Sequence, residues 1–151
     1  MLTKEHICVI ILRVEEKAMK KRHKFICILI CLFSLTCGFL SYVFFRPDTY
    51  FHVCVKEIVN IPESNSDGLV TYIFKYYFSD FAWAFSLTVS LSLIHSLKDS
   101  AVISFLFGVI WEIMQKMKIV KGTFDVVDIL VYFIAVIISI QTIKSIKRRI
   151  P

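Results

Sequence analysis

The segment FICILICLFSLTCGFLSYVFF, residues 25–45, decides the fold because it runs for 21 residues without a charged side chain. As an α-helix it would be about 31 Å long, which matches the roughly 30 Å hydrocarbon core of a bilayer. Basic residues precede it, and Arg46 and Pro47 follow it, where the proline would end a helix. We therefore predict a transmembrane span over 25–45 after a basic cytoplasmic segment over 1–24.

The composition also indicates an integral membrane protein. Of the 151 residues, 57% are apolar and 14 are Phe, and the mean hydropathy is +0.70. A net charge of +6 can indicate nucleic-acid binding, but here the basic residues cluster beside apolar runs, as topology signals do. The predicted environment is the lipid bilayer, with no nucleic-acid partner.

Three further apolar stretches, 80–97, 101–117 and 125–143, complete the predicted fold. The first of them is rich in small residues, which allow helices to pack closely in lipid: Ala82, Ala84, Ser86, Ser90 and Ser92. We predict an all-α bundle of four transmembrane helices in one domain, 25–151, with an outer loop over 46–79. Within this loop, the polar segment 48–79 could form a short strand pair or an interfacial helix.

The distribution of Lys and Arg predicts that both termini are cytoplasmic. This topology places 12 basic residues inside and six outside, and the reverse topology would break the positive-inside rule. Translation could start at Met1 or at Met19, because a basic segment directly before an apolar run also follows Met19.

Five polar residues fall at the predicted outer ends of the last three spans: Asp80, Glu112, Gln115, Asp125 and Asp128. The last four form two pairs spaced three apart, so each pair occupies one helix face. A charge in a membrane span costs roughly 2.5 to 3.5 kcal/mol on insertion scales, so these side chains should face the bundle interior or a polar cavity.

Several explanations of this cluster stay open. Asp80 follows Ser79 and could cap a helix N-terminus. Asp125 comes shortly after Gly122 and Thr123 and could do the same. Glu112 and Asp128 lie beyond cap positions and need a partner such as a lysine, water, a proton or a cation. They could form a proton site, a cation site or an acid/base pair, or they could make structural hydrogen bonds between helices.

Other candidate residues carry weaker signals. Trp83 and Trp111 lie beside the acids and could be interface anchors or an aromatic wall for a cationic headgroup. The five cysteines show no zinc-ligand spacing, and three of them lie inside the first span. We find no nucleophile motif or phosphate-binding glycine loop, so we predict no cofactor and no catalytic residues, and leave a metal open.

At these residues the chain resembles the VanZ-like family of small bacterial membrane proteins. The resemblance covers about residues 80–140 and rests on three motifs: D-x-x-W-A from Asp80, G-x-x-W-E-x-x-Q from Gly108, and G-T-F-D-x-x-D-x-x-x-Y from Gly122. Tyr132 and Ala135 stand where the family pattern often has Asn and Gly. The resemblance implies a multi-pass protein of the bacterial cell membrane, with a link to glycopeptide (teicoplanin) resistance.

Two functions follow as hypotheses. The first is a non-enzymatic envelope protein whose outer acidic pocket binds a lipid headgroup, a cell-wall precursor or a partner protein. The second is a membrane enzyme or a proton- or cation-coupled transporter that uses Glu112 and Asp128. A chain of 151 residues is small for a transporter unless it oligomerises, and the oligomeric state stays open.

Overall fold

The computed structural model describes residues 4–45, 68–120 and 122–149, with side chains from Lys21 onward, and these residues form five α-helices. The helices are α1 (Lys4–Phe45), α3 (Leu69–Tyr76), α4 (Phe78–Leu91), α5 (Leu97–Lys116) and α6 (Val126–Arg149). The all-α prediction is confirmed. Of the segment 48–79, predicted to form a short strand pair or an interfacial helix, residues 48–67 lie outside the described residues, and Leu69–Tyr76 forms α3.

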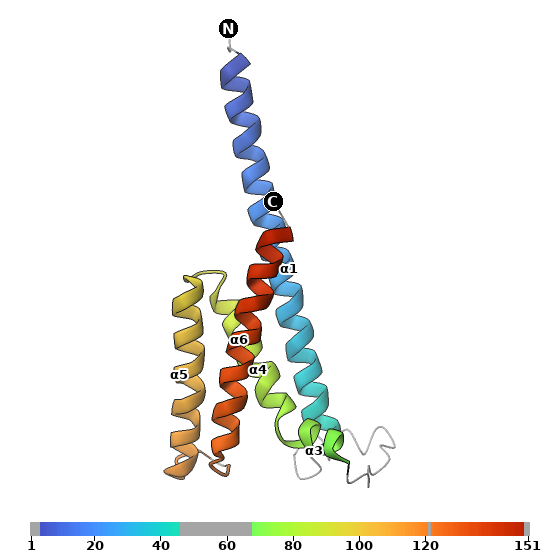
Figure 1. Ribbon diagram of the computed structural model, residues 1–151, viewed down its shortest axis with the longest axis vertical. Helices are drawn as coiled ribbons and strands as arrows, with labels where there is room; N and C mark the ends of the chain where they lie inside the picture. Colours follow the sequence, from blue (N-terminus) through green and yellow to red (C-terminus); the bar gives the residue numbers. More distant parts are fainter. Residues whose placement is uncertain (1–3, 46–67, 121, 150–151) are drawn as a thin grey trace.

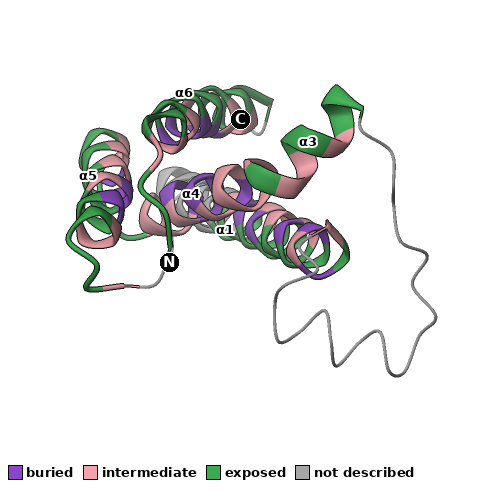
Figure 2. Cartoon of the chain, turned by 90° about the horizontal axis from the view of Figure 1, so that it is seen from below, coloured by how far each residue is buried: buried purple, intermediate pink, exposed green. Residues whose placement is uncertain are grey.

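Helix α4 occupies the centre of the bundle (Figures 1 and 2). It packs against α1, α3, α5 and α6, while α5 also packs against α6 and α3 against α1. The four longer helices alternate in direction, so the start of α4, the end of α5 and the start of α6 lie at the same end of the bundle (Figure 1).

Two helical segments in the described part of the chain are long and apolar enough to cross a membrane. They are Lys21–Phe45 within α1, with 25 residues, and Val126–Arg149, with 24 residues. Helix α1 ends directly before Arg46 and Pro47, as predicted, but it runs without a break from Lys4, so 1–24 and 25–45 are not separate helices. Length and composition alone are weak evidence for a membrane location.

The boundaries of the middle helices differ from the predicted spans over 80–97 and 101–117. Helix α4 has only 14 residues and ends at Leu91, after which a turn leads to Ser96. The Ser96 hydroxyl accepts the Asp99 N–H at 3.2 Å and donates to the Asp99 carboxylate at 2.6 Å. This cap starts α5 at Leu97, four residues before the predicted span, so hydropathy alone misplaced the boundary.

The inside of the bundle is lined largely by small and hydroxyl-bearing residues. The Ser86 hydroxyl donates to the Cys31 carbonyl of α1, and the Ser139 hydroxyl of α6 donates to the Phe85 carbonyl, both at 3.3 Å. At Gly38 of α1 the backbone comes so close to α4 that a Cβ there would lie 2.7 Å from the Ala82 Cβ. The predicted role of the α4 small residues in close helix packing agrees with these contacts.

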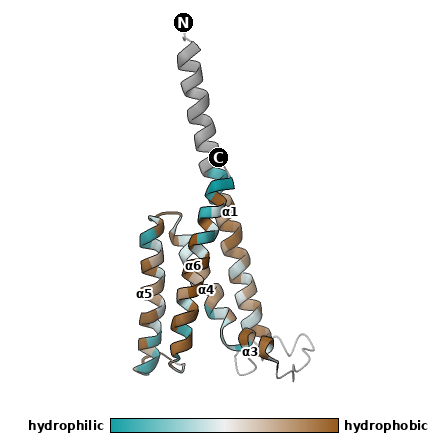
Figure 3. Ribbon diagram, in the orientation of Figure 1, coloured by the Kyte–Doolittle hydropathy of each residue, from teal (hydrophilic) through white to brown (hydrophobic). Residues whose placement is uncertain are grey.

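Large apolar side chains, by contrast, point outward from the bundle. Phe33 is 71% exposed, Leu130 57% and Ile110 55%, each on a different helix. Figure 3 shows apolar residues along much of α5 and α6 and of the 21–45 part of α1, and Figure 2 shows exposed residues on their outer faces. The apolar surface therefore faces away from the core.

Candidate functional site

The predicted site residues do meet at one end of the bundle. Asp80 lies in the first turn of α4, Glu112 and Gln115 lie near the end of α5, and Asp125 and Asp128 lie at the start of α6. These three helix ends are neighbours (Figure 1). The antiparallel order of α4, α5 and α6 brings the five residues to this end.

Glu112 is the most buried of these residues, with 1% of its surface exposed. Its Oε1 accepts a hydrogen bond from the Tyr132 hydroxyl at 3.1 Å, and its Oε2 accepts one from the Asp125 backbone N–H at 3.2 Å. Both carboxylate oxygens therefore face donors from α6 and its N-terminal cap. Glu112 joins the end of α5 to the start of α6, and we call this arrangement the Glu112 clamp.

Tyr132 completes the Glu112 clamp, although we did not include it among the predicted site residues. It is 2% exposed, and its ring lies against Gly108, where a Cβ would come within 2.5 Å of the ring Cδ2. Gly108 leaves space for the Tyr132 ring, and Glu112, four residues later on α5, accepts the hydrogen bond from the Tyr132 hydroxyl. In the sequence, the G-x-x-W-E motif pointed to Gly108 and Glu112. It did not indicate that Tyr132 of α6 contacts both of them.

Trp83 lies on the other side of the same tyrosine. Its ring meets the Tyr132 ring edge to face, with 6.4 Å between centroids, and the Phe107 ring at 5.4 Å. The Trp83 side chain of α4 thus packs against aromatic rings of both α5 and α6. Trp111, in contrast, is 40% exposed.

Gln115 hydrogen-bonds to the connection between α5 and α6. In the amide orientation that satisfies both neighbours, its nitrogen donates to the Thr123 carbonyl and its oxygen accepts the Trp111 indole N–H, each at 3.0 Å. Gly122 lies against this amide with a φ of +148°, and a Cβ there would come within 2.7 Å of the Gln115 Cδ. Glycine is required at this position both for its backbone angle and for space.

We expect the substitution Gly122→Ala to destabilise the protein by roughly 1 to 3 kcal/mol, the usual cost of a residue held at an unfavourable φ, ψ pair. Thermal unfolding in detergent would measure the change. The double variant Gly122→Ala/Gln115→Ala should relieve the steric contact but not the backbone strain. Wild-type stability for Gly122→Ala would contradict this explanation.

Asp125 and Asp80 differ in their local roles. The Asp125 Oδ1 accepts the Val127 N–H at 2.9 Å, so Asp125 caps α6 as predicted. Asp80 does not cap α4, because the cap position is Tyr77, two residues before Ser79. Asp80 instead lies in the first turn, where the helix dipole still favours a negative charge.

The electrostatics of the site centre on Tyr132. The negative charges of Asp80, Glu112 and Asp128 all act on its side chain, and the Asp128 Oδ1 is buried. At the rim, a hydrogen bond with Tyr72, together with burial and the nearby charges of Asp125 and Asp128, raises the pKa of Tyr77 to about 12. Tyr77 therefore remains a neutral hydroxyl at physiological pH.

The lysines at the end of α5 lie on the surface. Lys116 and Lys118 are exposed, and the Lys116 ammonium lies over the Phe124 ring, 5.1 Å from its centroid. Among the residues that the structure describes, no three His, Cys, Asp or Glu side chains are arranged to hold a metal ion. The arrangement can present carboxylate oxygens to a cationic or hydrogen-bond-donating group.

No protein-family model matches the chain, and no curated protein or solved structure matches it either. The resemblance to the VanZ-like family therefore remains a prediction that rests on the three motifs.

Proposed function

We propose that the chain is a non-enzymatic, four-span protein of the bacterial cell envelope, of the VanZ-like kind. In this proposal the acidic cluster binds a cationic group of a lipid headgroup or cell-wall precursor. The observation that carries it is the gathering of acids at one end of the bundle, where Asp80 and Asp128 are both partly exposed.

The packing pattern supports the membrane placement. Small and polar residues fill the interior and large apolar residues face outward, which is typical of helices packed in lipid and costly in water. Helix α4, at about 21 Å, is shorter than the roughly 30 Å hydrocarbon core. Leu91, where α4 ends, is partly buried against the other helices, whereas the turn residues Ile94, His95 and Ser96 are exposed.

The charge distribution supports the proposed sidedness. The acidic end carries three basic residues among those described: Lys75, Lys116 and Lys118. On the opposite side, Lys4, Arg13, Lys17 and Lys20 lie on α1 before the bundle. The residues there whose side chains are described include eight more basic ones: Lys21, Arg22, Lys24, Lys98, Lys144, Lys147, Arg148 and Arg149. By the positive-inside rule, the acidic cluster would face the outer side of the membrane.

The site geometry favours binding over catalysis. A general acid or base must reach its substrate, and Glu112, with 1% exposure and both oxygens bonded to α6 and its cap, is poorly placed to do so. The enzyme or coupled-transporter hypothesis that depends on Glu112 is therefore less well supported. Asp128, whose charge acts on the same Tyr132, would be the residue that meets a ligand, together with Asp80.

The substitution Asp128→Asn tests this proposal. Native mass spectrometry of the full chain in detergent would compare binding of phosphatidylethanolamine, whose headgroup carries a primary amine, with binding of phosphatidylcholine. We expect Asp128→Asn to keep the folded yield and to weaken phosphatidylethanolamine binding about tenfold or more, the usual worth of a charged hydrogen bond. Teicoplanin susceptibility of cells expressing the two forms would test the resistance link separately.

Asp99→Asn is the matched control, because it removes one exposed carboxylate from the other end of α5. It should leave phosphatidylethanolamine binding unchanged. Equal binding by wild type and Asp128→Asn, or the same loss in the control, would contradict a binding role for the acidic cluster.

A further inference from the structure

Two exposed basic segments occupy the end of the bundle opposite the acidic cluster. One comprises Lys21, Arg22 and Lys24 of α1, and the other lies at the end of α6, over 144–149. The sequence has no Asp or Glu between Lys17 and Pro47, and none after Asp128. Within these stretches the cations therefore have no acidic neighbours along the chain.

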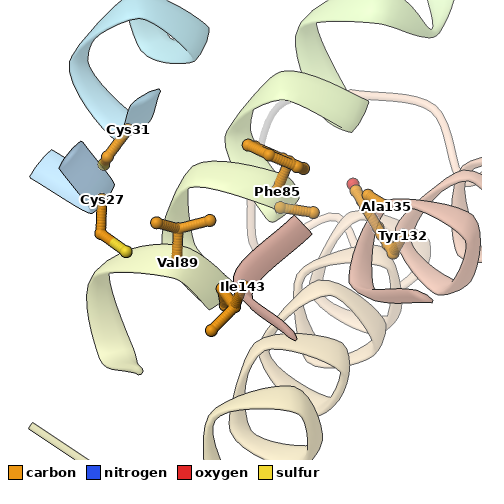
Figure 4. Packing of buried hydrophobic residues seen from close by; sticks show 8 residues of the cluster. Cys27, Cys31, Phe85, Val89, Tyr132, Ala135 and Ile143 are labelled. Atoms are coloured by element: carbon orange, nitrogen blue, oxygen red, sulfur yellow. The ribbon is translucent and has the colours of Figure 1, made fainter. Parts of the chain in front are cut away.

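The two basic segments lie side by side. Cys27, one turn beyond His23 on α1, and Ile143, one turn before Lys147 on α6, belong to the same buried cluster, as Figure 4 shows. Ile146 packs against this cluster, and the positive charge of Lys147 acts on His23. The contact between α1 and α6 thus concentrates both sets of cations at the point where the apolar lengths of the two helices begin.

A surface depression lies within the first of these segments. Three cations and two apolar side chains line it: Lys21, Arg22, Lys24, Phe25 and Ile28. Phe25 is 59% exposed and Ile28 44% exposed, and both lie on the apolar side of the cations along α1. The surface of the depression is nearly all apolar, so the three cations line it mainly with their aliphatic stems; they lie toward the end of the bundle, and Phe25 and Ile28 lie toward its middle. This is the order of headgroup and acyl chain in a phospholipid.

We propose that this depression binds an anionic phospholipid, with its phosphodiester held by Lys21, Arg22 and Lys24 and its acyl chain lying along Phe25 and Ile28. Guanidinium and ammonium groups donate charged hydrogen bonds to phosphate, and Arg can do so with two parallel bonds. The cations at the end of α6 add to the local positive potential. The inference uses the proposed membrane placement but does not depend on ligand binding at the acidic cluster.

Native mass spectrometry of the full chain in detergent, with phosphatidylglycerol and phosphatidylcholine at equal concentrations, tests the inference. Wild type should retain phosphatidylglycerol in preference. The variant Lys21→Gln/Lys24→Gln should bind it about tenfold or more weakly, since each basic residue near an anionic headgroup contributes about fivefold. Lys21→Arg/Lys24→Arg should bind like wild type.

Lys116→Gln/Lys118→Gln is the matched control, because it removes two exposed lysines from the other end of the bundle. Its phosphatidylglycerol binding should stay within about twofold of wild type. An equal loss in the control, or no preference for phosphatidylglycerol in wild type, would overturn the inference whether or not a variant folds poorly. Wild type that stays monodisperse without detergent would instead contradict the membrane placement.

Discussion

Replacing Glu112 with leucine is expected to destabilise the protein by about 2 to 4 kcal/mol and to remove most of the folded yield. The change leaves the Tyr132 hydroxyl and the Asp125 N–H without their acceptor. Each buried donor left unsatisfied costs about 1 to 3 kcal/mol, and release from burying a carboxylate offsets part of the total. Leucine fills similar space, so the loss would come from hydrogen bonding rather than from a cavity.

Thermal unfolding in detergent would measure this loss. Glu112→Gln is the graded control, because its amide oxygen can still accept from Tyr132 while its nitrogen faces the Asp125 N–H. We expect its stability to lie between those of wild type and Glu112→Leu. A leucine variant as stable as wild type would show that the Glu112 clamp does not hold α5 to α6.

The substitution Gly108→Ala is expected to cost about 1 to 3 kcal/mol, the usual effect of overpacking a tight core. The added Cβ would lie 2.5 Å from Cδ2 and 2.8 Å from Cγ of the Tyr132 ring. Because the hydroxyl at the far end of that ring is bonded to Glu112, the ring cannot move away without weakening the clamp. Gly108→Leu should prevent folding.

Gly68→Ala is the control for this prediction. Among the residues that the structure describes, a Cβ at Gly68 would meet only the Thr71 Oγ1, at 4.0 Å, and the Gly68 backbone is in an ordinary extended conformation. It should leave the unfolding temperature unchanged. If Gly108→Ala matched this control, the close contact between α5 and the Tyr132 ring would be contradicted.

The overall architecture could be predicted from hydropathy because its signals are local. The 21-residue apolar run and the proline after it located the end of α1 correctly, and Asp125 was recognised as a helix cap. The end of α4 at Leu91 could not be predicted in this way. Apolar residues continue to Leu97, and what divides them is the Ser96 cap, whose partner Asp99 lies inside the next helix.

The clustering of the five polar residues at one end of the bundle was predicted, but their contacts were not. Five polar residues were expected at one end, and the structure brings them there, yet Glu112 turns inward and Asp80 is not a cap. These differences depend on contacts between helices, such as that from Tyr132 to Glu112 across 20 residues, which helix periodicity does not encode. The cost of a charge in a membrane span predicted that Glu112 faces the interior but could not identify its donors.

A double-mutant cycle between Glu112 and Tyr132 tests the Glu112 clamp most directly. Unfolding free energies would be measured in detergent for wild type, Glu112→Leu, Tyr132→Phe and the double variant, because leucine cannot accept the Tyr132 hydroxyl. Since the two side chains are hydrogen-bonded at 3.1 Å in the bundle interior, the losses should not add, and the double variant should be more stable than their sum by about 0.5 to 3 kcal/mol. Losses that add within about 0.3 kcal/mol would contradict the clamp.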